Sequence, residues 1–176
     1  MIEAAGLRVA LDALVPYARW VTPPVDVRRF DTRFFIVRMP PNQMPAHDET
    51  ETTSGGWVSP ADALARCRRG ETSLPPPTWT TLRELEAFST ADDALAWARG
   101  RRIDTREPQL VECGDRKLLV LPGDPLSSDP RNEHGPAGSG PHGPTETRFE
   151  LVDGRWLARS VTGTTTKDTM DTKGKT

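Results

Sequence analysis

Residues 29–39 read RFDTRFFIVRM, and this segment decides the fold class predicted for the chain. Side chains alternate between the two faces of a strand, so even-numbered residues would share one face and odd-numbered residues the other. Apolar side chains occupy both faces at the far end, where Phe34 and Ile36 alternate with Phe35 and Val37. A strand covered on both sides is typical of a layered domain, so we predict an α/β (α+β) fold.

The segments after this strand predict three helices. Ser59 is a suitable N-cap, Pro60 fits the first helical position, and Gly70 can end that helix in the left-handed conformation. Either Ser89 or Thr90 would cap the last helix. The helix between them carries an apolar stripe, for which a core role is favoured over base stacking: Trp79, Leu82, Leu85 and Phe88.

Further strands are predicted on both sides of the helices. Residues 14–21 give a strand signal before the central segment, and Trp57-Val58 gives a short one after it. Two hairpins follow the helices. Gly114-Asp115 joins residues 109–113 to 116–121, and Asp153-Gly154 joins residues 147–152 to 155–159.

The length of 176 residues fits one domain with two less ordered parts. Residues 127–145 are rich in Gly, Pro and Ser, and residues 162–176 are polar. Neither stretch has enough apolar side chains to offset an ordering cost of roughly 1–2 kcal/mol per residue. We therefore predict a flexible insertion at 127–145, a hairpin at 146–161 that returns to the domain, and a disordered tail at 162–176.

Charge and cysteine content narrow the class of protein. The net charge of −2 gives no basic excess, so no nucleic-acid partner is expected. No apolar run approaches the ~20 residues that span a bilayer, and the first residues do not resemble a secretory signal, so no membrane partner is expected. Cys67 and Cys113 have no CxxC partner, and the three histidines show no metal-ligand spacing. We therefore predict a cytoplasmic protein with reduced thiols.

The order of several short motifs resembles the Nudix hydrolase family. The first motif, EAAGL at residues 3–7, is similar to the end of the Nudix box, which reads G, five residues, E, seven residues, R-E-U-x-E-E-x-G-U, with U apolar. Five motifs follow in the family's order: ARWVTP at 18–23, RRFDTRFF at 28–35, WVSPADA at 57–63, LPPPT at 74–78 and LPGDP at 121–125. The series resembles the C-terminal half of the branch that includes acyl-coenzyme A diphosphatases.

This resemblance implies a fold and a reaction. Residues 1–126 would form a partial Nudix-like domain, an incomplete α/β/α sandwich with a mixed sheet, followed by helices and hairpins. The family hydrolyses nucleoside diphosphates linked to another group, so the implied substrate is a nucleoside diphosphate or a coenzyme A derivative. Mg²⁺ or Mn²⁺ is the implied cofactor, because divalent cations neutralise phosphate oxygens and lower the pKa of the attacking water.

The resemblance also assigns site residues. Glu3 falls on the first glutamate of the E-E pair, and Glu51 lies in a loop that can supply a further metal ligand or a base. Both are candidate metal ligands, and Glu51 is the candidate catalytic residue. Ala4 stands where the family has its second glutamate, and an alanine cannot bind a cation. Guanidinium forks match phosphate oxygens, which makes three residues candidates for binding the substrate phosphates: Arg28, Arg29 and Arg33.

Each assignment has a structural alternative. Glu3 is also consistent with an ordinary exposed residue, Glu51 with a solvated acidic loop that includes Asp48 and Glu49, and the three arginines with surface residues. The R-E pair of the box would precede Met1, so the sequence fits either a start inside a longer reading frame or a truncated, non-catalytic remnant that binds a ligand or a partner. For the chain as it stands we expect little or no diphosphatase activity. Whether the protein is an enzyme, and its oligomeric state, stay open.

Overall fold

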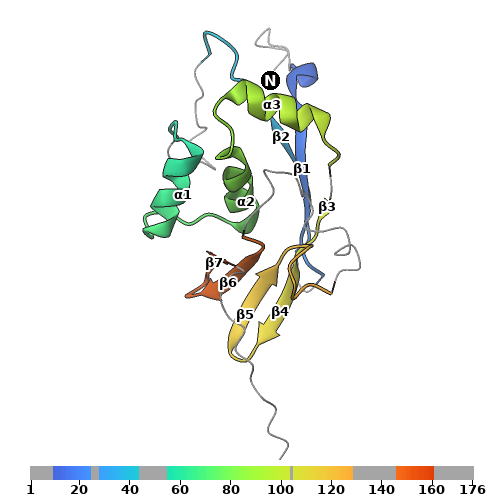
Figure 1. The fold of residues 1–176 in the computed structure, drawn as a ribbon, viewed down its shortest axis with the longest axis vertical. Coiled ribbons are helices and arrows are strands. Elements are labelled where there is room, and N and C mark those ends of the chain that lie inside the picture. Colours follow the sequence, from blue (N-terminus) through green and yellow to red (C-terminus); the bar gives the residue numbers. More distant parts are fainter. Residues whose placement is uncertain (1–9, 25–27, 44–54, 104, 129–145, 161–176) are drawn as a thin grey trace, which may run out of the picture.

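A computed structural model describes residues 10–24, 28–43, 55–103, 105–128 and 146–160 (Figure 1). Residues 129–145, which make up most of the predicted insertion, lie outside this part of the chain, and so does the predicted tail at 162–176. The flexibility of both therefore stays a prediction.

A mixed sheet forms one end of the described structure. Its strands are β1 (Val15–Val21), β2 (Asp31–Ile36) and β3 (Thr105–Arg106), in the order β2-β1-β3. Strand β1 is antiparallel to β2 and parallel to β3. The predicted mixed sheet is thus confirmed, and its parallel pair is made with β3, a strand that was not predicted.

The pairing of β1 with β2 contains an irregularity next to a large buried side chain. The register shifts between Pro16 and Ala18, so Tyr17 has no partner on β2. Proline cannot donate a ladder hydrogen bond and is tolerated at such bulges or at the first residues of a strand. The side chain of Tyr17 is completely buried, and across the irregularity the buried positions change from Val15 and Tyr17 to Ala18 and Trp20.

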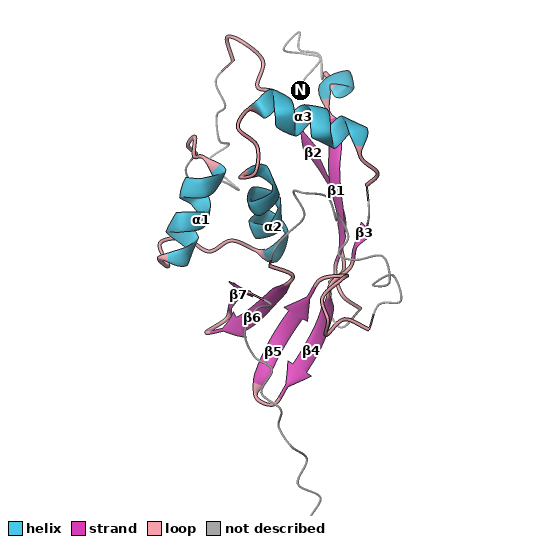
Figure 2. Ribbon diagram, in the orientation of Figure 1, coloured by secondary structure: helices cyan, strands magenta, loops and turns pink. Residues whose placement is uncertain are grey.

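Three helices in the described part of the chain match the predicted ones. They are α1 (Pro60–Arg68), α2 (Pro76–Leu85) and α3 (Ala91–Gly100). Figure 2 shows α3 crossing the end of the mixed sheet, while α1 and α2 lie side by side next to it. The prediction of three helices between the mixed sheet and the hairpins is confirmed.

Local hydrogen bonds explain where two of these helices begin. The Ser59 hydroxyl accepts a hydrogen bond from the Asp62 backbone N–H at 3.1 Å, which caps α1. The Thr90 hydroxyl accepts one from the Asp93 N–H, also at 3.1 Å, which caps α3 and decides between the two predicted caps. Gly70 has a φ of +76°, the left-handed conformation predicted for the residue after α1.

The chain ends in a four-stranded antiparallel sheet. Its strands are β4 (Gln109–Cys113), β5 (Arg116–Val120), β6 (Arg148–Val152) and β7 (Arg155–Arg159), in the order β4-β5-β6-β7. Both predicted hairpins are therefore confirmed. In Figure 1 this sheet lies below the helices, with β6 and β7 next to α2.

One hydrophobic core joins the two sheets and the helices. Its buried members come from every layer and include Val15, Tyr17, Trp20, Leu64, Trp79, Leu95, Leu121 and Phe149. The core role predicted for Trp79 is confirmed by its 6% exposure. Since β1 supplies several of these residues, the mixed sheet and the second sheet share one interior.

Two predictions about the strands are wrong. Trp57-Val58 is not a strand, and both side chains are exposed because no neighbouring strand or helix covers them in the described structure. Strand β2 is shorter than predicted and is not covered on both sides, since Phe35 and Val37 are each 48% exposed. Phe34 and Ile36, on the other face, pack against the core.

Candidate functional site

A cavity of about 700 Å³ opens where β2 ends and two helices begin. We call it the strand-end cavity. Its walls come from the end of β2, the start of α1, the end of α2 and the start of α3, and they are largely apolar. The principal apolar lining residues are Phe35, Val37, Leu85, Phe88, Ala94 and Leu95. A cavity of this size and character can hold a small-molecule ligand.

The pairing of β1 with β2 explains why distant segments meet at this cavity. Val15 pairs with Ile36, so β1 begins at the end of the sheet where β2 finishes. The segment that joins Arg38 to Ser59 leaves and returns at the cavity, because both of these residues line it. The chain therefore brings the start of β1 and both ends of this connecting segment to one end of the mixed sheet.

The two predicted metal ligands belong to the segments that reach this end of the sheet. Glu3 precedes β1, and Glu51 lies in the connection between Arg38 and Ser59. Both residues lie outside the described part of the chain. Their roles therefore stay predictions.

Charged side chains at the cavity are already engaged in ion pairs. Arg38 forms an ion pair with Asp92, and Glu86 forms one with Arg83. The side chains of Arg38 and Asp92 are 56% and 81% exposed, so this pair lies at the mouth of the cavity. A surface pair of this kind contributes at most ~1 kcal/mol and can exchange partners.

The described residues do not by themselves form a metal site. Within the ranges that the structure describes, no three His, Cys, Asp or Glu side chains come together closely enough to hold a cation. Glu86, the carboxylate among the lining residues, pairs with Arg83, and Asp92, which pairs with Arg38, lies outside the lining.

The structure separates the three candidate phosphate-binding arginines. Arg28 and Arg29 precede β2, at the end of the strand far from the cavity. A strand rises ~3.3 Å per residue, which puts Arg29 on the order of 20 Å from Ile36. The Arg29 Nη2 is 3.0 Å from the Glu107 Oε1, and its Nε donates to the Thr22 carbonyl at 3.2 Å.

Arg33 is the candidate arginine nearest to the strand-end cavity. It lies two residues before Phe35 on the same exposed face of β2, and its side chain faces solvent. Arg19 of β1 pairs with it in register. None of the three candidate arginines lines the cavity, and Arg33 is the one nearest to it along β2, so the phosphate-binding roles stay predictions.

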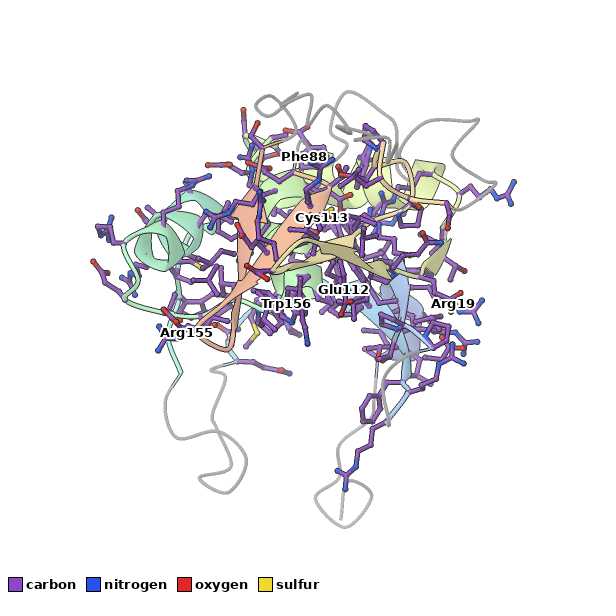
Figure 3. All side chains as sticks on the ribbon, turned by 90° about the horizontal axis from the view of Figure 1, so that it is seen from below. Arg19, Phe88, Glu112, Cys113, Arg155 and Trp156 are labelled. Carbon is purple, nitrogen blue, oxygen red and sulfur yellow. The ribbon has the colours of Figure 1, made fainter. Side chains whose placement is uncertain are left out.

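Arg19 holds a carboxylate beside Arg33. Its Nη2 and Nε lie 2.7 and 2.9 Å from the two carboxylate oxygens of Asp31. The hydrogen bonds from Arg19, followed by the charges of Arg19 and Arg33, lower the pKa of Asp31. Asp31 therefore stays ionised, and the exposed face carries two arginines for one carboxylate. Figure 3 shows Arg19 at the edge of the molecule, away from Phe88.

Two features of the site were missed in the sequence. Arg38 was counted only as part of the predicted strand, although a basic residue just before Pro40-Pro41 marks the point where the chain leaves the sheet. Phe88 was assigned to a core stripe, whereas it is half-buried and lines the cavity. Both residues face the cavity because of how α2, α3 and β2 pack, which their spacing in the sequence does not show.

A second, smaller apolar cavity lies on the covered face of the mixed sheet. Its volume is about 250 Å³, and its lining includes Trp20, Thr32, Phe34, Leu119 and Trp156. None of its described lining residues is charged. Because its described lining lacks charged residues, it can be compared with the strand-end cavity as a site for a charged ligand.

Comparison with known proteins relates part of the chain to three vertebrate enzymes. The acyl-coenzyme A diphosphatase NUDT19 of Xenopus laevis is 31% identical over 121 residues, the human protein is 34% identical over 121 residues, and the Gallus gallus protein is 30% identical over 124 residues. The predicted resemblance to Nudix acyl-coenzyme A diphosphatases is confirmed. It is partial, because each alignment covers 65% of this chain and 32% of the relative.

The chain thus spans about a third of the length of the curated relatives it matches. No protein-family model matches the chain, and no solved structure matches it. The mixed sheet and the helices are consistent with a partial Nudix-like α/β fold. Among the described helices, none has the length and apolar character needed to cross a bilayer.

Proposed function

We propose that this protein is a Nudix-type hydrolase that cleaves a nucleoside-diphosphate-linked substrate, with coenzyme A derivatives as the substrate class. The observation that carries the proposal is the 30–34% identity to three acyl-coenzyme A diphosphatases over 65% of the chain. The strand-end cavity supports it, because its apolar walls and the arginines near its mouth suit a ligand with both an apolar part and phosphates.

In the proposed reaction, water attacks one phosphorus of the diphosphate. The bridging P–O bond breaks, and two phosphomonoesters leave. Mg²⁺ or Mn²⁺ would neutralise the phosphate oxygens and acidify the water. Glu3 and Glu51 are the proposed metal ligands, and Glu51 is also proposed to accept the proton of the attacking water.

The arginines of the chain would bind the negative charge of the substrate. Arg33 is best placed near the strand-end cavity, and its guanidinium can donate two parallel hydrogen bonds to a phosphate. Arg28 and Arg29 would reach only the part of a long ligand that extends along β2, because they lie at its opposite end. Coenzyme A is long and flexible, which is compatible with such an extended path.

A second candidate function is ligand binding without catalysis. The observation that favours it is Ala4, which stands where the family has its second metal-binding glutamate and cannot bind a cation. In this case the strand-end cavity would still bind a coenzyme A derivative, but hydrolysis would not follow. The two functions therefore share a ligand and differ in turnover.

One experiment separates them. The purified chain is incubated with coenzyme A in the presence of Mg²⁺, Mn²⁺ or EDTA, and the two phosphomonoester products are measured by anion-exchange chromatography. Metal-dependent release that is lost in Glu51→Gln, but kept in the exposed control Glu112→Gln of β4, supports the hydrolase. Calorimetric binding without release supports the binding module. If the chain neither binds coenzyme A nor releases products, both functions are contradicted.

A further inference from the structure

We propose that the strand-end cavity binds the acyl chain of an acyl-coenzyme A and sets the chain length that the protein accepts. The inference rests on the proposed function for the ligand class, and on the described cavity for the location. It assigns the specificity to residues of α1 and α3 that border the cavity.

The walls of the cavity match an aliphatic chain. Phe35, Leu85, Phe88 and Leu95 present apolar surface from β2, α2, the segment after α2 and α3. The Phe88 ring is held against Trp97, with their centroids 5.3 Å apart, so this wall is fixed rather than loose. A volume of about 700 Å³ is large enough for a chain of several methylenes.

Exposed apolar groups at the mouth also favour such a ligand. Phe35 and Val37 are each 48% exposed, and both line the cavity. Large apolar side chains that gather around a concave surface commonly mark a binding site. An acyl chain would cover this surface as it enters and remove it from water.

The charge at the mouth suits the other end of the ligand. Arg38 lies at the rim, just after β2 ends, and Arg33 lies earlier, within β2. The partner of Arg38 is Asp92, whose side chain is 81% exposed and can be released to water at little cost. An acyl-coenzyme A has an apolar tail and a phosphate-bearing head. The cavity has a matching arrangement, with apolar walls inside and a basic residue at the rim.

The second cavity fits this ligand less well. It has a volume of about 250 Å³, and its described lining carries no arginine that could meet a phosphate. It is open to solvent like the strand-end cavity, so the two differ in size and in charge. It therefore serves as the control site.

Small residues at the borders of the strand-end cavity determine how much chain it can hold. Ala61 lies in the first turn of α1 and Ala91 begins α3, and both are exposed residues that line the cavity. A phenylalanine at either position would narrow the cavity without entering the buried core. Because they lie on separate helices, Ala61→Phe and Ala91→Phe test the same space independently.

The test compares coenzyme A, acetyl-coenzyme A and octanoyl-coenzyme A by calorimetry in EDTA. Each buried methylene should tighten binding by about fourfold at most, so octanoyl-coenzyme A should bind roughly tenfold or more tightly than acetyl-coenzyme A. Ala61→Phe and Ala91→Phe should remove most of this gain and affect coenzyme A less. Thr32→Phe, an exposed lining residue of the second cavity, should leave the gain intact.

The outcomes distinguish this inference from the function on which it rests. Equal affinity for all three ligands would overturn the acyl site while leaving the proposed function in place. A gain for octanoyl-coenzyme A that is lost in Thr32→Phe, and kept in both alanine variants, would place the chain in the second cavity and overturn the assignment. No binding of any ligand would contradict the proposed function itself. Circular dichroism of each variant confirms that a loss of binding is not a loss of folding.

Discussion

The Tyr17 hydroxyl donates a hydrogen bond to the Glu84 carboxylate at 3.0 Å, in a site where neither side chain reaches solvent. Arg106 forms an ion pair with the same carboxylate and is itself buried. Burial, followed by the charge of Glu84 and its hydrogen bond, raises the pKa of Tyr17 far above its usual range, so the phenol stays protonated. These three residues connect β1, α2 and β3 through one carboxylate.

Removing the Tyr17 hydroxyl should destabilise the fold. Tyr17→Phe leaves a buried carboxylate with one donor fewer, which we expect to lower the free energy of unfolding by ~1–3 kcal/mol. Urea unfolding at neutral pH measures this change in the free energy of unfolding. The control is Arg19→Gln, which removes an exposed ion pair with Asp31 and a 3.3 Å hydrogen bond to Thr105, and which should cost clearly less than Tyr17→Phe. Equal losses for the two variants would contradict the importance given to burial.

Removing Arg106, the cationic partner of Glu84, should lower the free energy of unfolding more than Tyr17→Phe does. Arg106→Met leaves the Glu84 charge with only the Tyr17 donor, and we expect a loss of ~3–5 kcal/mol. The double variant Arg106→Met/Glu84→Met removes both charges and should be less destabilised than Arg106→Met alone. Chemical denaturation of the single and double variants forms the cycle. The second single variant of the cycle is Glu84→Met. If the double variant loses as much stability as Arg106→Met and Glu84→Met added together, the two charges are not coupled.

The turn between β6 and β7 requires a glycine for its backbone conformation. Asp153 and Gly154 have φ values of 49° and 75°, and an added Cβ on Gly154 would meet no atom within 4 Å. Gly154→Ala should therefore lower the free energy of unfolding by ~1–2 kcal/mol through backbone strain alone. Gly100→Ala is the matched control, because that position in α3 is equally open and has no positive φ. It should be neutral or stabilising by up to ~1 kcal/mol, and thermal melts that rank the two variants in the reverse order would refute the argument.

Acid should weaken the second sheet through Glu150. Its carboxylate accepts hydrogen bonds from Arg159 Nε at 2.7 Å and Arg116 Nε at 2.8 Å, which lower its pKa, the Arg159 bond most. A carboxylate whose pKa is lower in the folded than in the unfolded state stabilises the fold at neutral pH, and this stabilisation is lost as the pH falls through the folded-state pKa.

The corresponding variant is Glu150→Gln. At neutral pH it should be less stable than the unmodified chain by an amount below ~1 kcal/mol, since the pairs are largely on the surface. Thermal melts from neutral pH to about pH 3 should show the difference shrinking as the carboxylate is protonated. A difference that does not change with pH would show that the charge of Glu150 is not the cause.

Among the three predicted phosphate-binding arginines, Arg33 should matter most for coenzyme A binding. Charge-assisted hydrogen bonds to phosphate are strong, so Arg33→Gln should weaken binding by roughly tenfold. Arg29→Gln should have a smaller effect, because that guanidinium is held by Glu107 far from the cavity. Calorimetry with Arg116→Gln, an exposed arginine of the second sheet, controls for loss of overall charge. An equal loss in the control would remove Arg33 from the proposed site.

Local features of this fold could be predicted from the sequence because their causes lie within a few residues. Ser59 and Thr90 cap helices through the backbone N–H three residues later. Asp153-Gly154 makes a turn because both residues tolerate a positive φ. The resemblance to acyl-coenzyme A diphosphatases was also carried by short motifs in a fixed order. None of these inferences required knowledge of which surfaces meet.

Features that depend on distant partners were decided by the tertiary structure. Strand β3 has two residues and is recognisable only through its pairing with β1. Glu84 and Arg106 look like ordinary surface charges in the sequence, yet they form a buried pair because α2 and β3 bring them together. Phe35 was predicted to be covered and is exposed, since burial depends on what packs against a strand and not on the strand's own pattern.

The candidate site shows the same division. Residue types alone made Arg28, Arg29 and Arg33 equivalent candidates, and the structure distinguishes them because a strand carries its first and last residues far apart. The strand-end cavity combines four elements that are remote in sequence, so no local pattern could indicate it. The sequence by itself determined the local conformations and the family resemblance, because both reside in short runs of residues. Only the packing of helices on the mixed sheet decided which side chains face a common space.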